Sequence, residues 1–224
     1  MYRKSKFLVR ADLNAIHQSQ VEALGDPGTW FSGQQRLAIV EEARSALAGG
    51  STSGRDVVLL LAHQLAASPQ GFTETVYTGA LDAGLSDAEY VEIVGLVSRL
   101  VNFDVLARGL GMDPVQLPAP KAGEPTRERP IEAVLEGAWA PTIPNGKQGG
   151  ELGRGLYGGR WKPFIIRALS LVPAELRKHY ELEEVQYLPL DRFPEYEYRH
   201  HEGLSRPQVE VVAGRVSALN ECFY

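Results

Sequence analysis

Apolar residues along this chain recur mostly at the three- and four-residue spacing of an amphipathic α-helix. We find no convincing series of strands with alternating apolar and polar residues and hairpin signals between them. The pattern therefore predicts an all-α fold. The predicted helices cover residues 36–47, 56–67, 72–83, 86 to 109 or 111, 163–171 and 173–187, and a last helix runs from 205 into the C-terminus.

Capping signals mark the starts of two predicted helices. Ser86 and Glu89, like Ser205 and Gln208, have the spacing of a capping box, in which the two side chains satisfy backbone N–H groups at the helix start. These signals make the helix starts at 86 and 205 the clearest in the chain.

Proline and glycine clusters divide the chain into units. Residues 112–130 are rich in proline, which removes backbone donors and favours an extended conformation. We expect a helical unit over residues 1–117, a proline-rich linker over 118–130 and a second helical unit over 131–224. The glycine-rich residues 141–159 are expected to be irregular.

Composition and charge narrow the class of protein. Of the 224 residues, 44% are hydrophobic and 23% are charged, which is typical of a globular protein. The net charge of -5 argues against a broad nucleic-acid interface, because such an interface needs a clustered excess of Lys and Arg. No apolar run reaches the roughly 20 residues that span a membrane, and no signal-type segment follows the basic N-terminus. We therefore expect a cytoplasmic protein with no nucleic-acid or membrane partner.

Two familiar motif types are incomplete in this sequence. Residues 153–158 match G-x-G-x-x-G, but a dinucleotide site needs a strand before the motif and a helix directly after it, and neither is predicted. The His-His-Glu run at 200–202 is a poor metal-ligand set, because adjacent side chains usually point apart. His179 and Glu183 lie one helical turn apart and fit either half of a metal site or a helix-surface hydrogen bond. We expect no bound cofactor and no metal.

Cys222 is the only cysteine, which excludes an intramolecular disulfide and a zinc site built on several thiolates. The chain before it echoes an earlier segment, since Ser-Ala-Leu at 217–219 precedes Cys222 as Ser-Ala-Leu at 45–47 precedes Gly50. This echo predicts an internal repeat whose second copy lacks the later helices of the first. The apolar stripe of the last helix comprises Val209, Val212, Ala213, Val216 and Leu219.

Residues 85–94 read Leu-Ser-Asp-Ala-Glu-Tyr-Val-Glu-Ile-Val and are followed by Asn-Phe-Asp at 102–104 and Ala-Arg-Gly-Leu-Gly at 107–111. This sequence resembles the distal helix of AhpD-like alkylhydroperoxidases and carboxymuconolactone decarboxylases. Residues 167–173 and 210–224 are similar to the segments that lead into the redox motif of that family. The resemblance covers about half of the chain and implies two AhpD-like helical repeats, of which the second is incomplete at the C-terminus.

The redox motif of that family is a glutamate, eleven intervening residues and a Cys-x-x-Cys pair, with a histidine four residues after the second cysteine. By resemblance, Glu210 takes the glutamate position, Cys222 the first cysteine position, and Tyr224 the intervening position where members carry His or Tyr. The second cysteine position follows Tyr224. The first repeat lacks these redox residues, and its corresponding residues are Ala38, Gly50 and Ser53.

The resemblance implies thiol peroxidation. A thiolate at the second motif position attacks a hydroperoxide and becomes a sulfenic acid, which the first cysteine converts to a disulfide that a thiol electron donor reduces. Cys222 would be this resolving residue, and Glu210 would be the base end of a proton relay. In a straight helix the two residues lie about 18 Å apart, so contact requires a break, for which Asn220 is the expected position.

One hypothesis places a selenocysteine codon directly after Tyr224, because similar proteins with selenocysteine in the motif end there when UGA is read as a stop. A selenol is largely ionised at neutral pH and is the better peroxide nucleophile. A fragment or a natural truncation is the alternative. In either case we expect the full-length form to be a thiol or selenol peroxidase or disulfide oxidoreductase, and the present chain to lack peroxidase turnover.

Two other functions stay open. A decarboxylase of the carboxymuconolactone type shares the fold but needs a pocket for a lactone carboxylate. A non-catalytic helical module for oligomerisation or binding fits the empty first repeat and the aromatic segment 193–198. Relatives similar to this chain assemble as homo-oligomers, so we expect a homo-oligomer, with a hydroperoxide and a thiol donor as its further partners.

Overall fold

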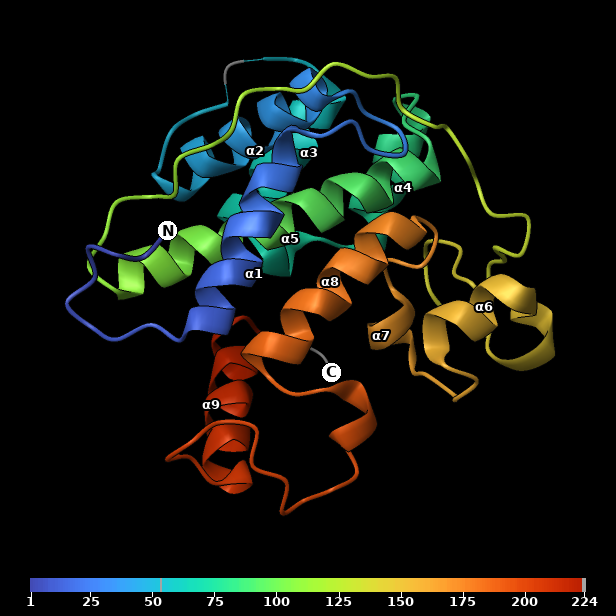
Figure 1. Cartoon of the computed structure of the whole chain (residues 1–224). Helices are drawn as coiled ribbons and strands as arrows, with labels where there is room; N and C mark the ends of the chain where they lie inside the picture. Colours follow the sequence, from blue (N-terminus) through green and yellow to red (C-terminus); the bar gives the residue numbers. More distant parts are fainter. Residues whose placement is uncertain (53, 223–224) are drawn as a thin grey trace.

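The computed structural model describes residues 1–52 and 54–222 as α-helices joined by loops and 3₁₀ turns (Figure 1). Within these residues there is no β-strand, and Val134 and Thr142 form one isolated antiparallel bridge. The predicted all-α fold is therefore confirmed. The helices are α1 (Ala11–Glu22), α2 (Gly33–Leu47), α3 (Val57–Ala67), α4 (Glu74–Asp82), α5 (Asp87–Gly109), α6 (Gly150–Tyr157), α7 (Phe164–Arg167), α8 (Pro173–Gln186) and α9 (Arg206–Leu219). No helix of the described residues is both long enough and apolar enough to cross a membrane.

Helix α5 runs through the centre of the molecule (Figure 1). It packs against α1, α2, α3, α4 and α8, so its buried residues lie on several faces rather than on one stripe. The largest apolar side chains that it buries are Tyr90, Ile93, Leu96, Leu100 and Phe103. The hydrophobic core is therefore built around this helix.

Capping boxes open three helices. The Ser86 hydroxyl accepts the backbone N–H of Glu89 at 3.2 Å, and the Glu89 carboxylate accepts the Ser86 N–H at 2.9 Å, which confirms the predicted start of α5. Ser205 opens α9 in the same way, as predicted. A third box, formed by Ser32 and Gln35, opens α2 three residues before the predicted start.

The prediction that residues 141–159 are irregular is wrong, because they contain a 3₁₀ turn (Gly146–Gly149) and then α6. Tertiary contacts hold this helix despite its three glycines, whose low helix propensity opposes it. The Tyr157 hydroxyl donates to the carbonyl of Ile143 at 2.8 Å, and Leu156 is buried. The helix predicted over 163–171 is also shorter than expected, since α7 ends at Arg167.

Helix α1 is absent from the predicted helices because polar residues occupy its buried face. His17 and Gln20 are buried, together with Val21, where α1 packs against α5 and α8. The Tyr2 hydroxyl lies 2.6 Å from His17 Nδ1, so a side-chain hydrogen bond takes the place of a purely apolar contact at this position. An apolar spacing rule cannot detect such a face.

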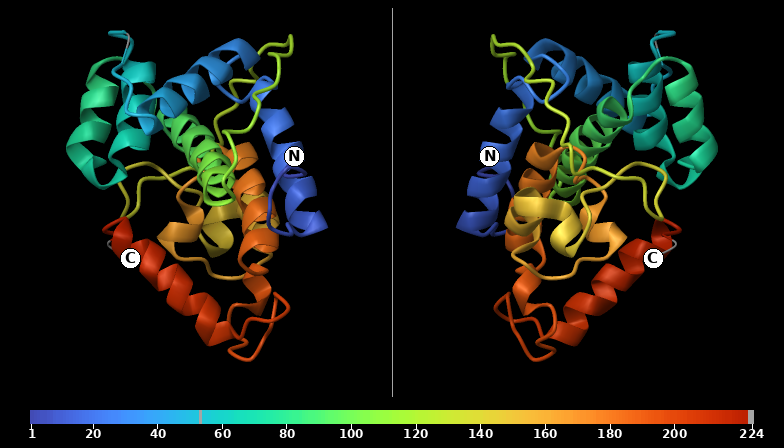
Figure 2. Two further views of the ribbon diagram at one scale, coloured as in Figure 1. Left: turned by 90° about the vertical axis from the view of Figure 1, so that its left-hand side faces the viewer. Right: turned by 90° about the vertical axis from the view of Figure 1, so that its right-hand side faces the viewer.

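The proline-rich stretch 118–130 is extended, as expected, and backbone hydrogen bonds attach it to the loop after α1. Lys121 N–H donates to the carbonyl of Gly25 at 2.8 Å, and Arg127 N–H donates to that of Thr29 at 2.7 Å. Beyond this stretch the chain returns to the first helices, where α8 packs against α1 and α5 (Figures 1 and 2).

Candidate functional site

Glu210, the predicted base, lies on the second turn of α9, and its carboxylate contacts a tyrosine hydroxyl and an arginine. The Tyr187 hydroxyl lies 2.7 and 2.8 Å from its two carboxylate oxygens, and Arg206 forms an ion pair with it one helical turn earlier. Burial acts to raise the pKa of Glu210, but the Tyr187 hydrogen bond and Arg206 outweigh it and lower that pKa. Glu210 is therefore an oriented, ionised carboxylate at neutral pH.

Cys222, the predicted resolving residue, carries an exposed thiol just past α9. The helix ends at Leu219 with Asn220 as its C-cap, the position expected for a break. Between Glu210 and Leu219 the helix is uninterrupted, which spans about 14 Å at 1.5 Å per residue. The structure thus places Glu210 and Cys222 at opposite ends of α9 without bringing them together, and Tyr224 lies outside the described residues.

Helix α9 projects from the edge of the molecule (Figure 2). Arg206 is its one buried residue, and no other helix packs extensively against it in the described chain. Its predicted apolar stripe is largely open, and the exposed large side chains are Val211, Val212, Val216 and Leu219.

Two of the histidines singled out in the sequence, His201 and His179, contact other protein groups. The Nε2 atom of His201 lies 3.1 Å from the Gln186 carbonyl, and its Nδ1 contacts Arg10. His179 and Glu183 lie 3.9 Å apart as a helix-surface pair. Among the described residues, no group of three or more His, Cys, Asp or Glu side chains could hold a metal ion.

Residues 153–158 also lack the geometry of a dinucleotide loop. The first five of them belong to α6, and Gly158 caps that helix in the left-handed conformation. In a dinucleotide site the glycines precede a helix and follow a strand, whereas here they are the helix itself.

The strongest concentration of buried charge lies elsewhere, between α2, α5 and α8. Arg36 Nη1 donates to carboxylate oxygens of Glu92 and of Glu175, the latter at 3.1 Å. Arg99 Nη2 donates to the other oxygen of Glu175 at 2.6 Å, and its Nη1 donates to Gln20 at 3.2 Å. Each of the four charged side chains is at most 2% exposed, so this ion-pair network is shielded from solvent.

The two acids of the ion-pair network differ in their surroundings. Burial raises the pKa of Glu92, and its contact with Arg36 and the Trp30 N–H offset this only in part. Burial also opposes ionisation of Glu175, but Arg99 and Arg36 outweigh it and lower its pKa. Glu175 is therefore the firmly ionised centre, and removing it would leave two arginines buried together.

Two glycines permit the close approach that the ion-pair network needs. A Cβ on Gly28 would lie 1.9 Å from a carboxylate oxygen of Glu92 and 2.2 Å from Arg36 Nη1. A Cβ on Gly95 would lie 2.8 Å from a carboxylate oxygen of Glu175. Any side chain at these positions would force the charged groups apart.

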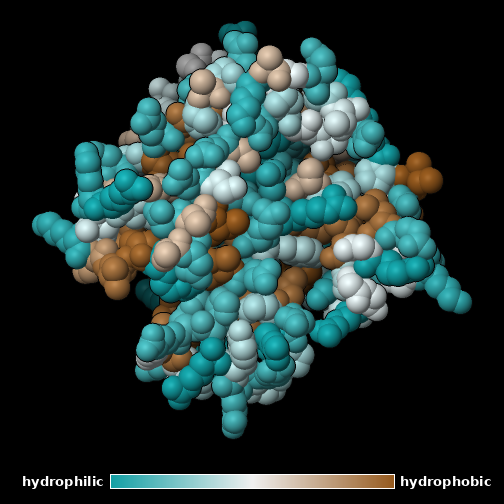
Figure 3. Space-filling view, viewed as in Figure 1, coloured by the Kyte–Doolittle hydropathy of each residue, from teal (hydrophilic) through white to brown (hydrophobic). Residues whose placement is uncertain are grey.

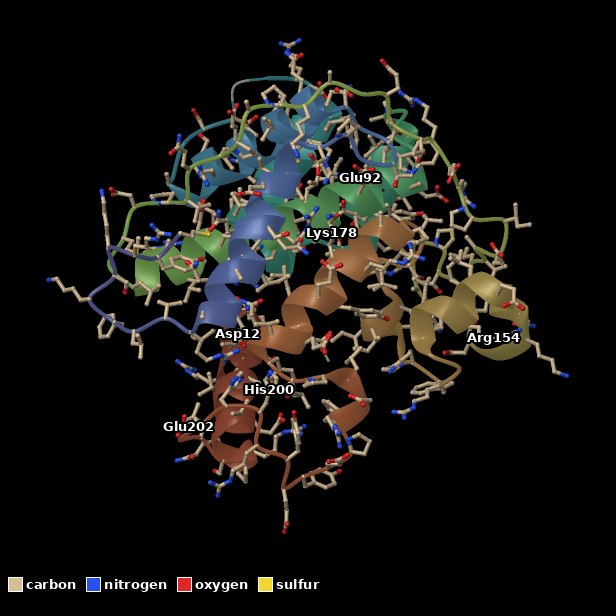
Figure 4. The ribbon with its side chains drawn as sticks, in the orientation of Figure 1. Asp12, Glu92, Arg154, Lys178, His200 and Glu202 are labelled. Atoms are coloured by element: carbon tan, nitrogen blue, oxygen red, sulfur yellow. The ribbon has the colours of Figure 1, made fainter. Side chains whose placement is uncertain are left out.

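Two residues of the ion-pair network, Arg36 and Glu175, line the floor of a cleft of about 710 Å³. Three distant segments line this cleft: the loop at 26–29, the extended residues 126–130 and the start of α8 at 173–178. Figure 4 shows Lys178 on α8 and Glu92 on α5 in this central region. On the same face, hydrophobic residues are exposed between α8 and α6 within a surface that is otherwise largely hydrophilic (Figure 3).

No match to this chain is found among protein-family models, curated proteins or solved structures. The residues of this chain and their geometry are therefore the basis for a function.

Sequence reasoning missed the ion-pair network, although it leaves a signal. Glu92 lies between Val91 and Ile93 on a helix that is otherwise apolar there, and Arg36 directly precedes Leu37. A charged residue inside an apolar pattern indicates a buried ion pair. Its partner could not be predicted, because Glu175 is 139 residues from Arg36 in sequence.

Proposed function

We propose that the full-length form of this protein is an AhpD-like thiol or selenol peroxidase or disulfide oxidoreductase, which acts in the cytoplasm as a homo-oligomer, and that the 224-residue chain is inactive. The observation that supports this function best is the exposed Cys222 thiol two residues after the C-cap of α9, with ionised Glu210 on that helix. A resolving thiol must be accessible, because it attacks a sulfenic acid and then exchanges with a donor thiol.

The proposed catalytic cycle has three steps. A thiolate or selenolate at the position after Tyr224 attacks the hydroperoxide, which releases an alcohol and leaves an S–OH or Se–OH group. The Cys222 sulfur attacks that group, which forms the S–S or Se–S bond and releases water. Two donor thiols then reduce the bond and become a disulfide. Glu210 serves as the base end of the proton relay that ionises the attacking group.

The test compares the 224-residue chain with the product of the same gene read past the Tyr224 codon as selenocysteine or cysteine. We expect the extended protein to oxidise a thiol donor in the presence of cumene hydroperoxide, and Cys222→Ser and Glu210→Gln to remove most of that rate. The 224-residue chain itself should show no turnover.

Two outcomes would contradict this proposal. An extended protein without hydroperoxide-dependent thiol oxidation would remove the function, and sustained Cys222-dependent turnover by the 224-residue chain would show that it needs no further residue. Release of CO₂ from a muconolactone without added thiol would favour a decarboxylase instead.

The exposed face of α9 favours a second candidate, a non-catalytic oligomerisation or binding module. Its exposed valines are the kind of apolar surface that a partner covers. Light scattering at micromolar concentration tests this. If the module exists, the double substitution Val212→Asp and Val216→Asp should dissociate the oligomer, whereas Val105→Asp, at an exposed valine of α5, should not. A monomeric wild-type chain would exclude it.

A further inference from the structure

The cleft above the ion-pair network has charged walls whose acids are mostly neutralised within the protein. Asp26 forms an ion pair with Lys121 at 2.6 Å. Glu175 is held by Arg36 and Arg99. The charged lining residues are the basic Arg36, Arg129, Arg177 and Lys178 and the acidic Asp26, Glu128 and Glu175.

Two basic side chains at this cleft have no such partner. Arg177 and Lys178 form no ion pair within 4 Å with any residue of the described chain, whereas Arg129 pairs with Asp87 at 2.6 Å. Burial and then the positive charge of Arg99 lower the pKa of Lys178. A negative group beside Lys178 would relieve that repulsion.

Arg36, on the floor of the cleft, is only partly satisfied by its two carboxylates. Both accept from Nη1, so Nε is buried with no acceptor, and Nη2 makes no hydrogen bond to the described residues. The side chain is 2% exposed. A buried guanidinium with unused donors is unusual, since such donors normally find an acceptor.

The start of α8 adds a further donor beside these cations. Pro173 has no N–H group, and the N–H of Ala174 has no backbone acceptor in the described chain, because the helix has not yet made its first turn. The dipole of this 14-residue helix places partial positive charge at the same end. Backbone and side chains therefore favour one sign of ligand charge.

Apart from Thr29 and Thr126, the uncharged lining of the cleft is apolar. The cleft volume of about 710 Å³ is that of a small-molecule site. The apolar lining side chains are those of Ala23, Pro27, Pro130, Leu152, Pro173 and Ala174. A ligand that fills the cleft would bring an apolar body as well as a negative group.

We propose that this cleft binds a small organic oxyanion, in which a carboxylate or phosphate group lies between Arg177, Lys178 and the start of α8 and an apolar body lies against the prolines and Leu152. Neither Cys222 nor Glu210 lines this cleft, so oxyanion binding can be disproved without affecting the proposed peroxidase function.

Two probes with the same apolar body separate the two anionic groups. We would titrate benzoate and phenyl phosphate into the 224-residue chain by calorimetry. Binding of benzoate alone would identify a carboxylate site, and binding of phenyl phosphate alone a phosphate site. With the double substitution Arg177→Gln and Lys178→Gln, we expect the affinity to fall at least about tenfold, because two charge-assisted contacts are lost.

Arg154→Gln is the matched control. Arg154 lies on α6, is 66% exposed at its side chain and points outward, away from the cleft (Figure 4). It should bind either probe as the wild type does. Failure of both probes to bind below about 10 mM, or equal affinities for the double variant and Arg154→Gln, would overturn the proposal.

A second measurement does not depend on the folding of any variant. Acetic anhydride labelling of wild-type Lys178, measured by mass spectrometry, should decrease when the tighter probe is bound, whereas labelling of Lys147 on the 3₁₀ turn before α6 should not. Equal labelling of Lys178 with and without the probe would also overturn the proposal.

Discussion

Helices α5 and α9 begin with the same capping motif but differ in how much of their surface is buried. Ser86 and Ser205 each open a capping box, and both helices carry apolar residues at helical spacing. Yet α5 is buried on several faces, whereas α9 buries only Arg206. The comparison shows that capping and periodicity determine where a helix starts, and that neighbouring elements determine whether its apolar residues become core.

The same contrast holds for their charged residues. On α5, Glu92 and Arg99 are buried and belong to the ion-pair network that joins α2 and α8 to the centre of the molecule. On α9, Glu210 contacts Arg206 on its own helix and Tyr187, the C-cap of α8. The charges of α5 thus hold distant segments together, and those of α9 act locally.

The largest effect should come from removing the charge at the centre of the ion-pair network. Glu175→Ala leaves Arg36 and Arg99 buried without their shared carboxylate, which we expect to destabilise the protein by about 3–5 kcal/mol in urea unfolding. Glu151→Ala, whose ion pair with Arg154 is exposed, is the control and should change stability little. Similar unfolding midpoints for the two variants would mean that the buried charges contribute no more than surface ones.

A second effect concerns α1 and should appear as the pH falls. Burial lowers the pKa of His17 to about 4, whereas an unfolded histidine titrates near 6.5, so the unfolded chain binds the proton more tightly. The contribution of His17 is fully present above about pH 6.5 and is lost as the pH falls to about 4, a difference of about 3 kcal/mol. We expect His17→Asn to flatten this part of the profile of unfolding free energy against pH. Parallel profiles for the variant and the wild type would show that His17 does not titrate in this way.

Gly28 should tolerate no side chain. The Cβ of Gly28→Ala would meet Glu92 and Arg36 at distances that no real contact shows, so the loop or the ion-pair network must move. We expect a loss of about 1–3 kcal/mol in thermal or urea unfolding. Gly79→Ala on α4, where a Cβ meets nothing within 4 Å, is the matched control and should be neutral or slightly stabilising. Equal stability of the two variants would contradict the close approach.

The smallest effect is expected on α9. Val212→Ala removes an exposed side chain and should change the unfolding free energy of the monomer by less than about 0.5 kcal/mol. Leu96→Ala, at a fully buried position of α5, should cost about 2–5 kcal/mol in the same assay. A large cost for Val212→Ala at low protein concentration would show that α9 is covered within the monomer.

The candidate sites differ in how far the sequence could predict them. The resemblance to a family redox motif within one segment predicts Glu210, Cys222 and Tyr224 as site residues. The structure confirms the helix that carries Glu210, while the peroxidase roles stay predictions. The cleft for which we propose oxyanion binding was not predicted, because its walls come from 26–29, 126–130 and 173–178, and no local pattern relates segments so far apart.

Local interactions explain what the sequence by itself determined: the all-α class, the starts of α5 and α9 at their serine caps, and the extended proline-rich stretch. Each depends on hydrogen bonds or steric limits within a few residues, which a local pattern encodes. Only the tertiary structure decided that α1 and α6 form, that Arg36 meets Glu175, and that α9 stays exposed. Those outcomes depend on which surfaces meet. Tertiary packing stabilises a helix of low propensity such as α6, whereas a well-capped helix such as α9 stays exposed when no neighbouring element covers it.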